Sequence, residues 1–105
     1  MSKDPFLNPD YKPDDKTRQE IEKLHDNGVS LSGIHLKYAN MKNAKLVNVD
    51  MSGADLTRSD FSGASMYGAN LEGANLFKAI FEGANLKSAN LCNSDLLGVD
   101  FSNSK

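Results

Sequence analysis

Two histidines, one cysteine and several aspartates are the side chains of this 105-residue sequence that could bind a metal or catalyse a reaction. His25 and His35 do not have a spacing typical of metal ligands, either with each other or with Cys92. A cysteine acts as a nucleophile beside a base such as histidine, and two aspartates share a proton only when their carboxylates lie close together. The fold therefore decides whether these groups can act.

The sequence repeats every five residues from residue 29 onward. The middle residue of each unit is large and apolar: Leu31, Leu36, Met41, Leu46, Met51, Leu56, Phe61, Met66, Leu71, Leu76, Phe81, Leu86, Leu91, Leu96 and Phe101. The residue two positions earlier is small or β-branched, and it is alanine in nine of these fifteen units. The residue between the two is asparagine or aspartate in ten units, and glycine often ends the unit.

This period of five fits neither an α-helix nor a long strand. The two apolar positions are two residues apart, so they face the same way on an extended segment. A turn must follow each pair, because the next pair would otherwise face outward, and glycine suits a turn that needs a positive φ. The pattern predicts a coil with a narrow apolar interior. Phe61, Phe81 and Phe101 recur at intervals of twenty, which favours four units per coil.

Several units carry a recognisable signature: Ala54-Asp55-Leu56, Ala69-Asn70-Leu71, Ala74-Asn75-Leu76, Ala84-Asn85-Leu86 and Ala89-Asn90-Leu91. They resemble the A-(D/N)-L-x-x repeat of the pentapeptide-repeat family, and the resemblance covers residues 29–105. It implies an all-β solenoid, a right-handed quadrilateral β-helix of nearly four coils built from 15 repeats. Its expected core centres include Leu56, Phe61, Leu71, Leu76, Phe81, Leu86 and Leu91.

Residues 1–28 are interpreted as an extended segment followed by a capping helix. Three prolines make residues 1–13 extended or loose, and a helix is expected from about Asp14 to Asp26. Ile21 and Leu24 share one face of this helix, which is expected to cover the open end of the first coil. A helix that binds a partner is the alternative.

The ends of this helix carry their own signals. Asp14 or Asp15 can cap its start, and Thr17 with Glu20 fits a capping box. Gly28 can end it.

Charge and composition exclude some classes of partner. The net charge is −2, and the acidic excess lies in residues 1–28, because residues 29–105 carry seven acidic and seven basic side chains. This balance argues against direct binding to nucleic acid or to an anionic membrane. One cysteine allows no internal disulfide, and no signal peptide or transmembrane segment is recognised. A cytoplasmic protein is expected, and export by another route stays open.

A twenty-residue coil keeps the reactive side chains apart. Cys92 would lie three coils from His35 and on another face. Asp55 would stack next to His35, and Asp60 next to Asn40, so that no two carboxylates become neighbours in these columns. We therefore expect no enzyme, no cofactor and no bound metal.

The same coil places outward residues in columns. One column is Lys37, Thr57, Phe77 and Leu97, and the next is Tyr38, Arg58, Lys78 and Gly98. Phe77 and Leu97 are expected to be adjacent and exposed, with Ile80 near the following corner. Arg58, Lys78 and Tyr38 would flank them, as a protein-binding face or as a ladder that only stabilises neighbouring coils. A weaker column, Val47, Tyr67 and Lys87, is interpreted as structural.

The last coil carries Leu96 and Phe101 and has no evident cap. We expect end-to-end dimerisation there, or a partner that covers it. The predicted function is a protein–protein interaction or scaffold module whose partner is unknown. The alternative is a DNA-mimicking protein that binds gyrase or another topoisomerase, as some members of the resembled family do. A neutral, short repeat region without loops argues against that alternative, and a spacer or regulatory appendage is a third reading.

Overall fold

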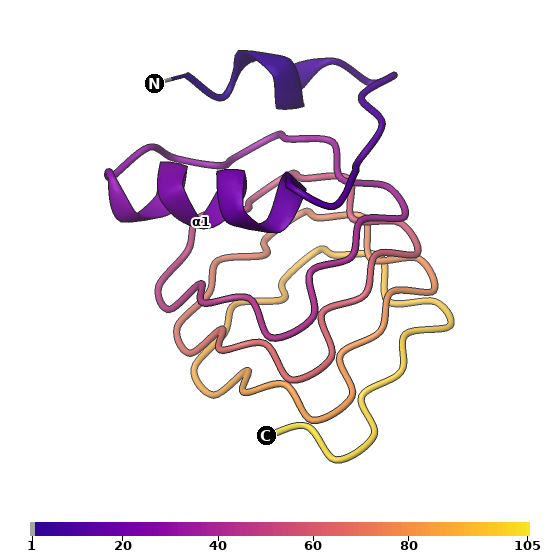
Figure 1. Ribbon diagram of the computed structural model, residues 1–105. Coiled ribbons are helices and arrows are strands. Elements are labelled where there is room, and N and C mark those ends of the chain that lie inside the picture. The colour runs from indigo at the N-terminus through magenta and orange to yellow at the C-terminus, as the bar shows by residue number, and fades with distance from the viewer. Residues whose placement is uncertain (1) are drawn as a thin grey trace.

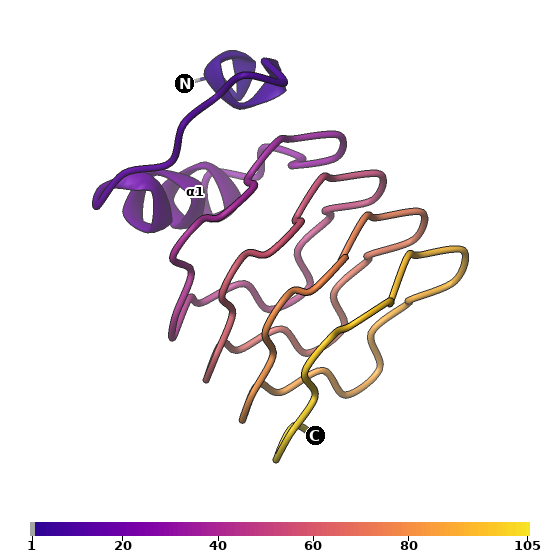
Figure 2. The same ribbon diagram turned by 90° about the vertical axis from the view of Figure 1, so that its right-hand side faces the viewer.

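The computed structural model describes residues 2–105, which form two short helices followed by a stack of coils (Figure 1). A 3₁₀-helix, η1, spans Asp4–Leu7, and an α-helix, α1, spans Thr17–Asp26. Beyond them, parallel bridges join residues twenty positions apart, as from His35 to Asp55. Each coil therefore holds four five-residue units, and Figure 2 shows the coils stacked in chain order away from the helices.

The coils pair through isolated bridges, and no strand is found in the part of the chain that the structure describes. Leu56 donates its N–H to the Asn75 carbonyl of the next coil at 2.8 Å, and Asp55 donates to the Ile34 carbonyl of the previous coil at 2.9 Å. The chain then turns at once, because the Ser59 N–H bonds back to the Leu56 carbonyl at 3.0 Å. The expected parallel pairing between coils is present, although each extended segment is too short to form a strand.

The apolar centres fill the interior of the coils. Those from Leu31 to Phe81 are buried, as are the alanines from Ala39 to Ala84. The rings of Phe61 and Phe81 stack with centroids 5.2 Å apart, and those of Phe81 and Phe101 with centroids 5.7 Å apart. The predicted phenylalanine column is therefore confirmed.

The last coil is less well buried than the sequence predicts. Leu86 and Leu91, both expected in the core, are only partly buried. Phe101 is likewise half-buried and Leu96 is 40% exposed, because their side chains have a neighbouring coil on one side only. End-to-end association through this edge stays a prediction.

Helix α1 begins three residues later than expected, and the predicted capping box is wrong. Lys16 occupies the N-cap position and makes no side-chain cap bond. The Thr17 hydroxyl instead accepts the Asp14 N–H at 2.8 Å, while the Asp14 carboxylate accepts the Lys16 N–H at 2.9 Å. These two bonds close a turn ahead of the helix. The first turn of α1 therefore has no bond from a side-chain cap.

Residues 2–13 contain a helical turn, η1, where the prolines suggest an extended or loose segment. Phe6, within η1, is buried, and its ring meets that of Tyr11 edge-on with centroids 4.6 Å apart. The expectation of an extended or loose segment is wrong here, because burial of one aromatic ring against the coil stabilises a helical turn. Figures 1 and 2 show η1 and α1 together over the first coil.

The two helices supply hydrogen bonds that a preceding coil would make. The Phe6 carbonyl accepts the His35 N–H at 2.7 Å, and the Glu22 carboxylate accepts the Lys45 N–H at 2.8 Å. The His25 ring nitrogen Nε2 bonds to the Val47 carbonyl at 2.8 Å. These three backbone groups of the first coil are thereby satisfied.

Apolar burial accompanies these bonds. Ile21 and Leu24 of α1 are buried against the coil interior. Gly28, at φ 78°, ends the helix as expected, with its N–H bonded to the His25 carbonyl at 2.9 Å. Within residues 2–105, neither helix is long and apolar enough to cross a membrane.

Candidate protein-binding site

One corner of the coils differs from the other three in its side chains. Each corner residue has a positive φ, a conformation that costs a residue with a side chain about 1–2 kcal/mol. At the other corners the positions are filled by glycine, asparagine or serine. Here the first three positions are filled by Tyr38 (φ 60°), Arg58 (φ 57°) and Lys78 (φ 55°), which we call the corner column, and the fourth is Gly98 (φ 72°). Large side chains are thus retained where glycine would be less strained.

Backbone bonds set the corner column beside the neighbouring outward column. The Arg58 N–H donates to the Phe77 carbonyl at 2.8 Å, and the Lys78 N–H donates to the Leu97 carbonyl at 2.9 Å. The Tyr38 N–H makes the equivalent bond one coil earlier. Each corner side chain therefore starts directly above an outward residue of the next coil.

Two cations lie close to the Phe77 ring. The Arg58 guanidinium carbon is 5.8 Å from the ring centroid and the Lys78 ammonium is 5.3 Å from it. Both distances suit cation–π attraction. Phe77 is consequently half-buried, which corrects the expectation that it is exposed, whereas Leu97 is 68% exposed.

The two cations have no anionic neighbour among the residues that the structure describes. Of the seven cations of residues 29–105, Lys37, 3.8 Å from the Asp55 carboxylate, and Lys42, 3.7 Å from Asp60, are the two that pair with a described anion.

The remaining predicted residues of this face lie around it. Tyr38 is 69% exposed and sits one coil above Arg58. Ile80 is half-buried in the bridge column of Asp60 and Asp100, which belongs to the next side of the coil. The structure thus brings Arg58, Phe77 and Lys78 into direct contact and leaves Ile80 around the corner.

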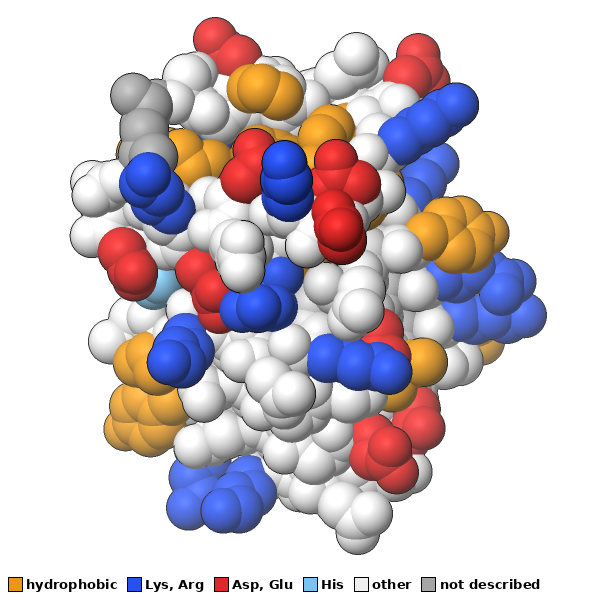
Figure 3. All heavy atoms as spheres, viewed as in Figure 1, with side chains coloured by type: hydrophobic (Ala, Val, Ile, Leu, Met, Phe, Trp, Pro, Cys, Tyr) orange, Lys and Arg blue, Asp and Glu red, His pale blue; other side chains and the backbone are white. Residues whose placement is uncertain are grey.

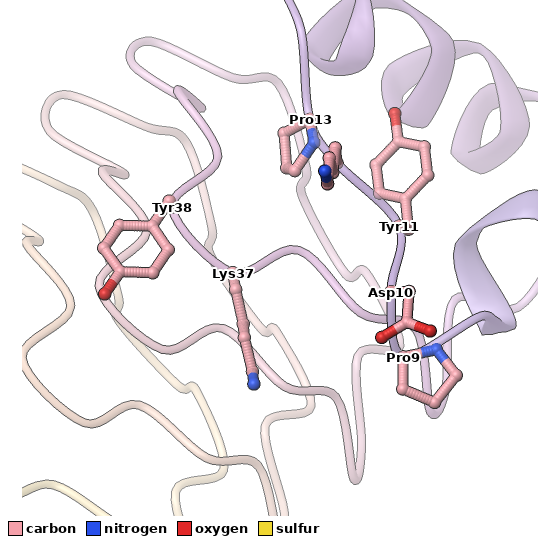
Figure 4. A pocket seen from close by; sticks show the side chains of 7 residues that line it. Pro9, Asp10, Tyr11, Pro13, Lys37 and Tyr38 are labelled. Carbon is pink, nitrogen blue, oxygen red and sulfur yellow. The ribbon is translucent and has the colours of Figure 1, made fainter.

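A hollow of about 630 Å³ adjoins the upper end of the corner column. Lys37 and Tyr38 form one wall, and residues 9–13, which carry Tyr11 and Lys12, form the other (Figure 4). Sequence reasoning missed this hollow, because residues 1–13 were expected to be loose. The signal that could have revealed it is the pair of aromatic residues between the prolines.

Tyr11 is held firmly in that wall. Its hydroxyl lies 2.8 Å from the Thr17 hydroxyl, and its ring contacts Phe6. Burial raises the pKa of the Tyr11 hydroxyl above its ordinary value. The wall opposite Tyr38 is therefore built from packed residues rather than from a free tail.

The candidate catalytic side chains form no reactive pair in the described structure. The Nδ1 atom of His35 is buried without a hydrogen bond, 4.0 Å from an oxygen of Asp55. The other Asp55 oxygen accepts the Thr57 hydroxyl at 2.6 Å. Cys92 is exposed in the last coil. No cluster of three metal-ligating side chains occurs in residues 2–105.

Comparisons with known proteins agree with the coil geometry. A family model described as pentapeptide repeats matches residues 27–63, 54–91 and 69–105. A search of curated proteins found no match.

Three solved structures are similar to this chain. A pentapeptide repeat protein from the cyanobacterium Cyanothece 51142 shares 35% identity and a TM-score of 0.69, over 72% of this chain and 52% of that protein. HetL, a protein of Nostoc sp. strain PCC 7120 involved in heterocyst differentiation regulation, shares 33% identity and a TM-score of 0.71, over 73% of this chain and 36% of HetL. Another pentapeptide repeat protein from Nostoc PCC 7120 shares 24% identity and a TM-score of 0.52, over 93% of this chain and 78% of that protein, which supports the fold alone. The chain spans only about half or a third of the first two relatives.

Proposed function

Because the chain belongs to the pentapeptide-repeat family, we propose that it is a non-catalytic protein-binding module built as a right-handed quadrilateral β-helix. The face that binds is formed by the corner column with Phe77 and Leu97. The observation that carries this proposal is the Phe77 ring with the cations of Arg58 and Lys78 over it and an exposed Leu97 in the same column. Aromatic and arginine side chains next to exposed apolar surface are typical of the energetic centre of protein interfaces.

The alternative of a stabilising ladder explains less of this face. A ladder accounts for contacts between Phe77 and its neighbours, but it does not require large side chains at positive φ. The DNA-mimicking alternative needs an acidic face, and this face is cationic. HetL, one of the similar proteins, is involved in a regulatory process, a kind of role that an interaction module fills.

The test is an affinity pull-down from lysate of the source organism with the full chain as bait. The Phe77→Ser, Leu97→Ser double variant should lose a partner that the wild type retains. The Val47→Ser, Tyr67→Ser double variant is the matched control, because it removes two exposed apolar side chains from another column. Circular dichroism confirms that both variants fold. The proposal fails if both variants retain the same partners as the wild type.

A further inference from the structure

The space around a corner glycine depends on the residue twenty positions earlier, which lies at the same corner of the previous coil. Three corner glycines follow another glycine in this way, and a Cβ built on them would meet nothing within 4 Å: Gly53, Gly73 and Gly83. A Cβ on Gly63 would overlap the side-chain amide oxygen of Asn43. A Cβ on Gly68 would overlap that of Asn48. A side chain at one corner therefore folds over the glycine of the next coil.

Lys78 folds over Gly98 in the same manner. A Cβ built on Gly98 would lie 2.9 Å from the Cγ atom of Lys78 and 3.7 Å from its Cα atom. Cγ is the first stem atom beyond Cβ, so it moves aside only by rotation about χ1, which turns the rest of the side chain with it. The missing side chain of Gly98 thus permits the direction in which the Lys78 stem leaves the backbone.

This direction brings the Lys78 ammonium over the Phe77 ring, 5.3 Å from its centroid. A lysine stem is apolar and covers neighbouring surface while its ammonium stays in water. The Lys78 N–H donates to the Leu97 carbonyl, so the stem begins directly above the exposed Leu97. Figure 3 shows basic side chains gathered at the right-hand edge of the face in view, next to hydrophobic ones.

The Arg58 side chain reaches the same ring by another route. The residue below Arg58 in the corner column is Lys78, which carries a Cβ of its own. The Arg58 guanidinium extends to Phe77 in the next coil, whereas Lys78 turns back to its own neighbour in the sequence. Of the two cations over the ring, the lysine is therefore the one whose position depends on Gly98.

Resting on the proposed binding function, we infer that Gly98 is a positioning residue of the proposed binding face and acts through Lys78. The partner meets the Phe77 ring, the Lys78 side chain and Leu97 in one arrangement, so the lysine needs no further ordering when it binds. A side chain at position 98 turns Lys78 away from the ring and weakens binding, whether or not that position contacts the partner.

The first test is a spectroscopic signature of the lysine, measured by ¹H–¹³C NMR on the full chain. The ring current of Phe77 should shift the ε-methylene protons of Lys78 upfield, and Phe77→Leu should abolish this shift. Gly98→Ala should move these protons to the position of an exposed lysine. Gly83→Ala is the matched control, because its φ is 68° against 72° at Gly98 and its Cβ would meet nothing within 4 Å. It should leave the shift unchanged, and the dispersed amide spectrum of each variant shows that it folds.

The second test repeats the pull-down with the same two glycine variants. Gly98→Ala should capture about fivefold less of the partner that Phe77→Ser, Leu97→Ser loses, and Gly83→Ala should capture as much as the wild type. The positioning role is overturned if the Lys78 protons stay shifted in Gly98→Ala, or if they move and capture is unchanged. If Phe77→Ser, Leu97→Ser retains every partner, the binding function itself fails, and the NMR shift then reports only the contact between Gly98 and Lys78.

Discussion

The Glu22 carboxylate accepts the backbone N–H of Lys45 at 2.8 Å, in the place where a carbonyl of a preceding coil would lie. Glu22→Ala removes this acceptor and should lower the free energy of unfolding by about 0.5–1.5 kcal/mol, because the bond is exposed and water can replace the carboxylate. Glu22→Gln retains an acceptor oxygen and should lose less. Urea denaturation of the two variants measures the difference, and equal losses would contradict the bond.

Arg18→Ala is the control for this prediction. It removes only the i, i+4 ion pair between Arg18 and Glu22, whose atoms lie 2.7 Å apart. Such a pair contributes about 0.2–0.5 kcal/mol, so the control should change stability much less than Glu22→Ala.

The phenylalanine column predicts a gradient of stability along the stack. Phe81 is fully buried between two rings, so Phe81→Ala should cost about 3–5 kcal/mol. Phe101 has a ring on one side only and is half-buried, so Phe101→Ala should cost clearly less. Thermal unfolding of both variants tests this order, and similar costs would show that the last coil is as well packed as the centre.

At the corners, where φ is positive, replacing glycine by alanine and replacing tyrosine by glycine should change stability in opposite directions. Gly53 has φ 65°, and an added Cβ would meet nothing within 4 Å, so Gly53→Ala should cost about 1 kcal/mol from conformation alone. Tyr38→Gly relieves about 1–2 kcal/mol of strain against an entropic cost of about 0.5–1 kcal/mol, so it should stabilise slightly. Denaturant midpoints measure both changes. A destabilised Tyr38→Gly would mean that the tyrosine side chain contributes packing that offsets its strain.

The lowered pKa of Asp50 leads us to expect a smaller free energy of unfolding in acid. The Ser52 hydroxyl and backbone N–H bond to its carboxylate at 2.7 and 3.1 Å, and these bonds hold the pKa of Asp50 below its ordinary value. A folded-state pKa below the unfolded one contributes stability that is present above the unfolded value and is lost as the pH falls through the folded one. Stability should therefore fall below about pH 4.

The Ser52→Ala variant isolates this contribution to the pH dependence. It removes the hydroxyl bond and should flatten the fall in stability, measured by urea denaturation at a series of pH values. Ser65→Ala is the control, and it should leave the slope unchanged. An unaltered slope in Ser52→Ala would show that other carboxylates determine the acid response.

The sequence predicts the coil well because its signal is repeated. Each apolar centre, from Leu31 to Phe101, indicates the same local geometry. A misinterpreted unit is therefore outweighed by the units on either side of it. The N-terminal segment has no such repetition. The aromatic pair Phe6 and Tyr11 is a signal given only once, and it does not specify that the Phe6 ring packs on the coil. The bonds that replace the capping box at Thr17 are also specific to this segment, where the Tyr11 hydroxyl lies 2.8 Å from the Thr17 hydroxyl.

Most residues of the proposed binding face could be predicted from the sequence, but their contacts could not. A twenty-residue register places Arg58 and Lys78 beside Phe77 without any structure. Whether the cations extend into solvent or fold over the ring depends on side-chain conformation, which the register does not specify. This is why Phe77 was expected to be exposed and is half-buried instead.

The interior and the surface of this chain repeat with different periods. The interior repeats every five residues, whereas outward side chains realign only every twenty. Inserting one five-residue unit between Arg58 and Phe77 would leave every later apolar centre pointing inward, yet it would move Phe77 by a quarter of a turn. Evolution can therefore lengthen such a chain one unit at a time without disturbing its core. Inserting one, two or three units, however, changes which residues share an outer face.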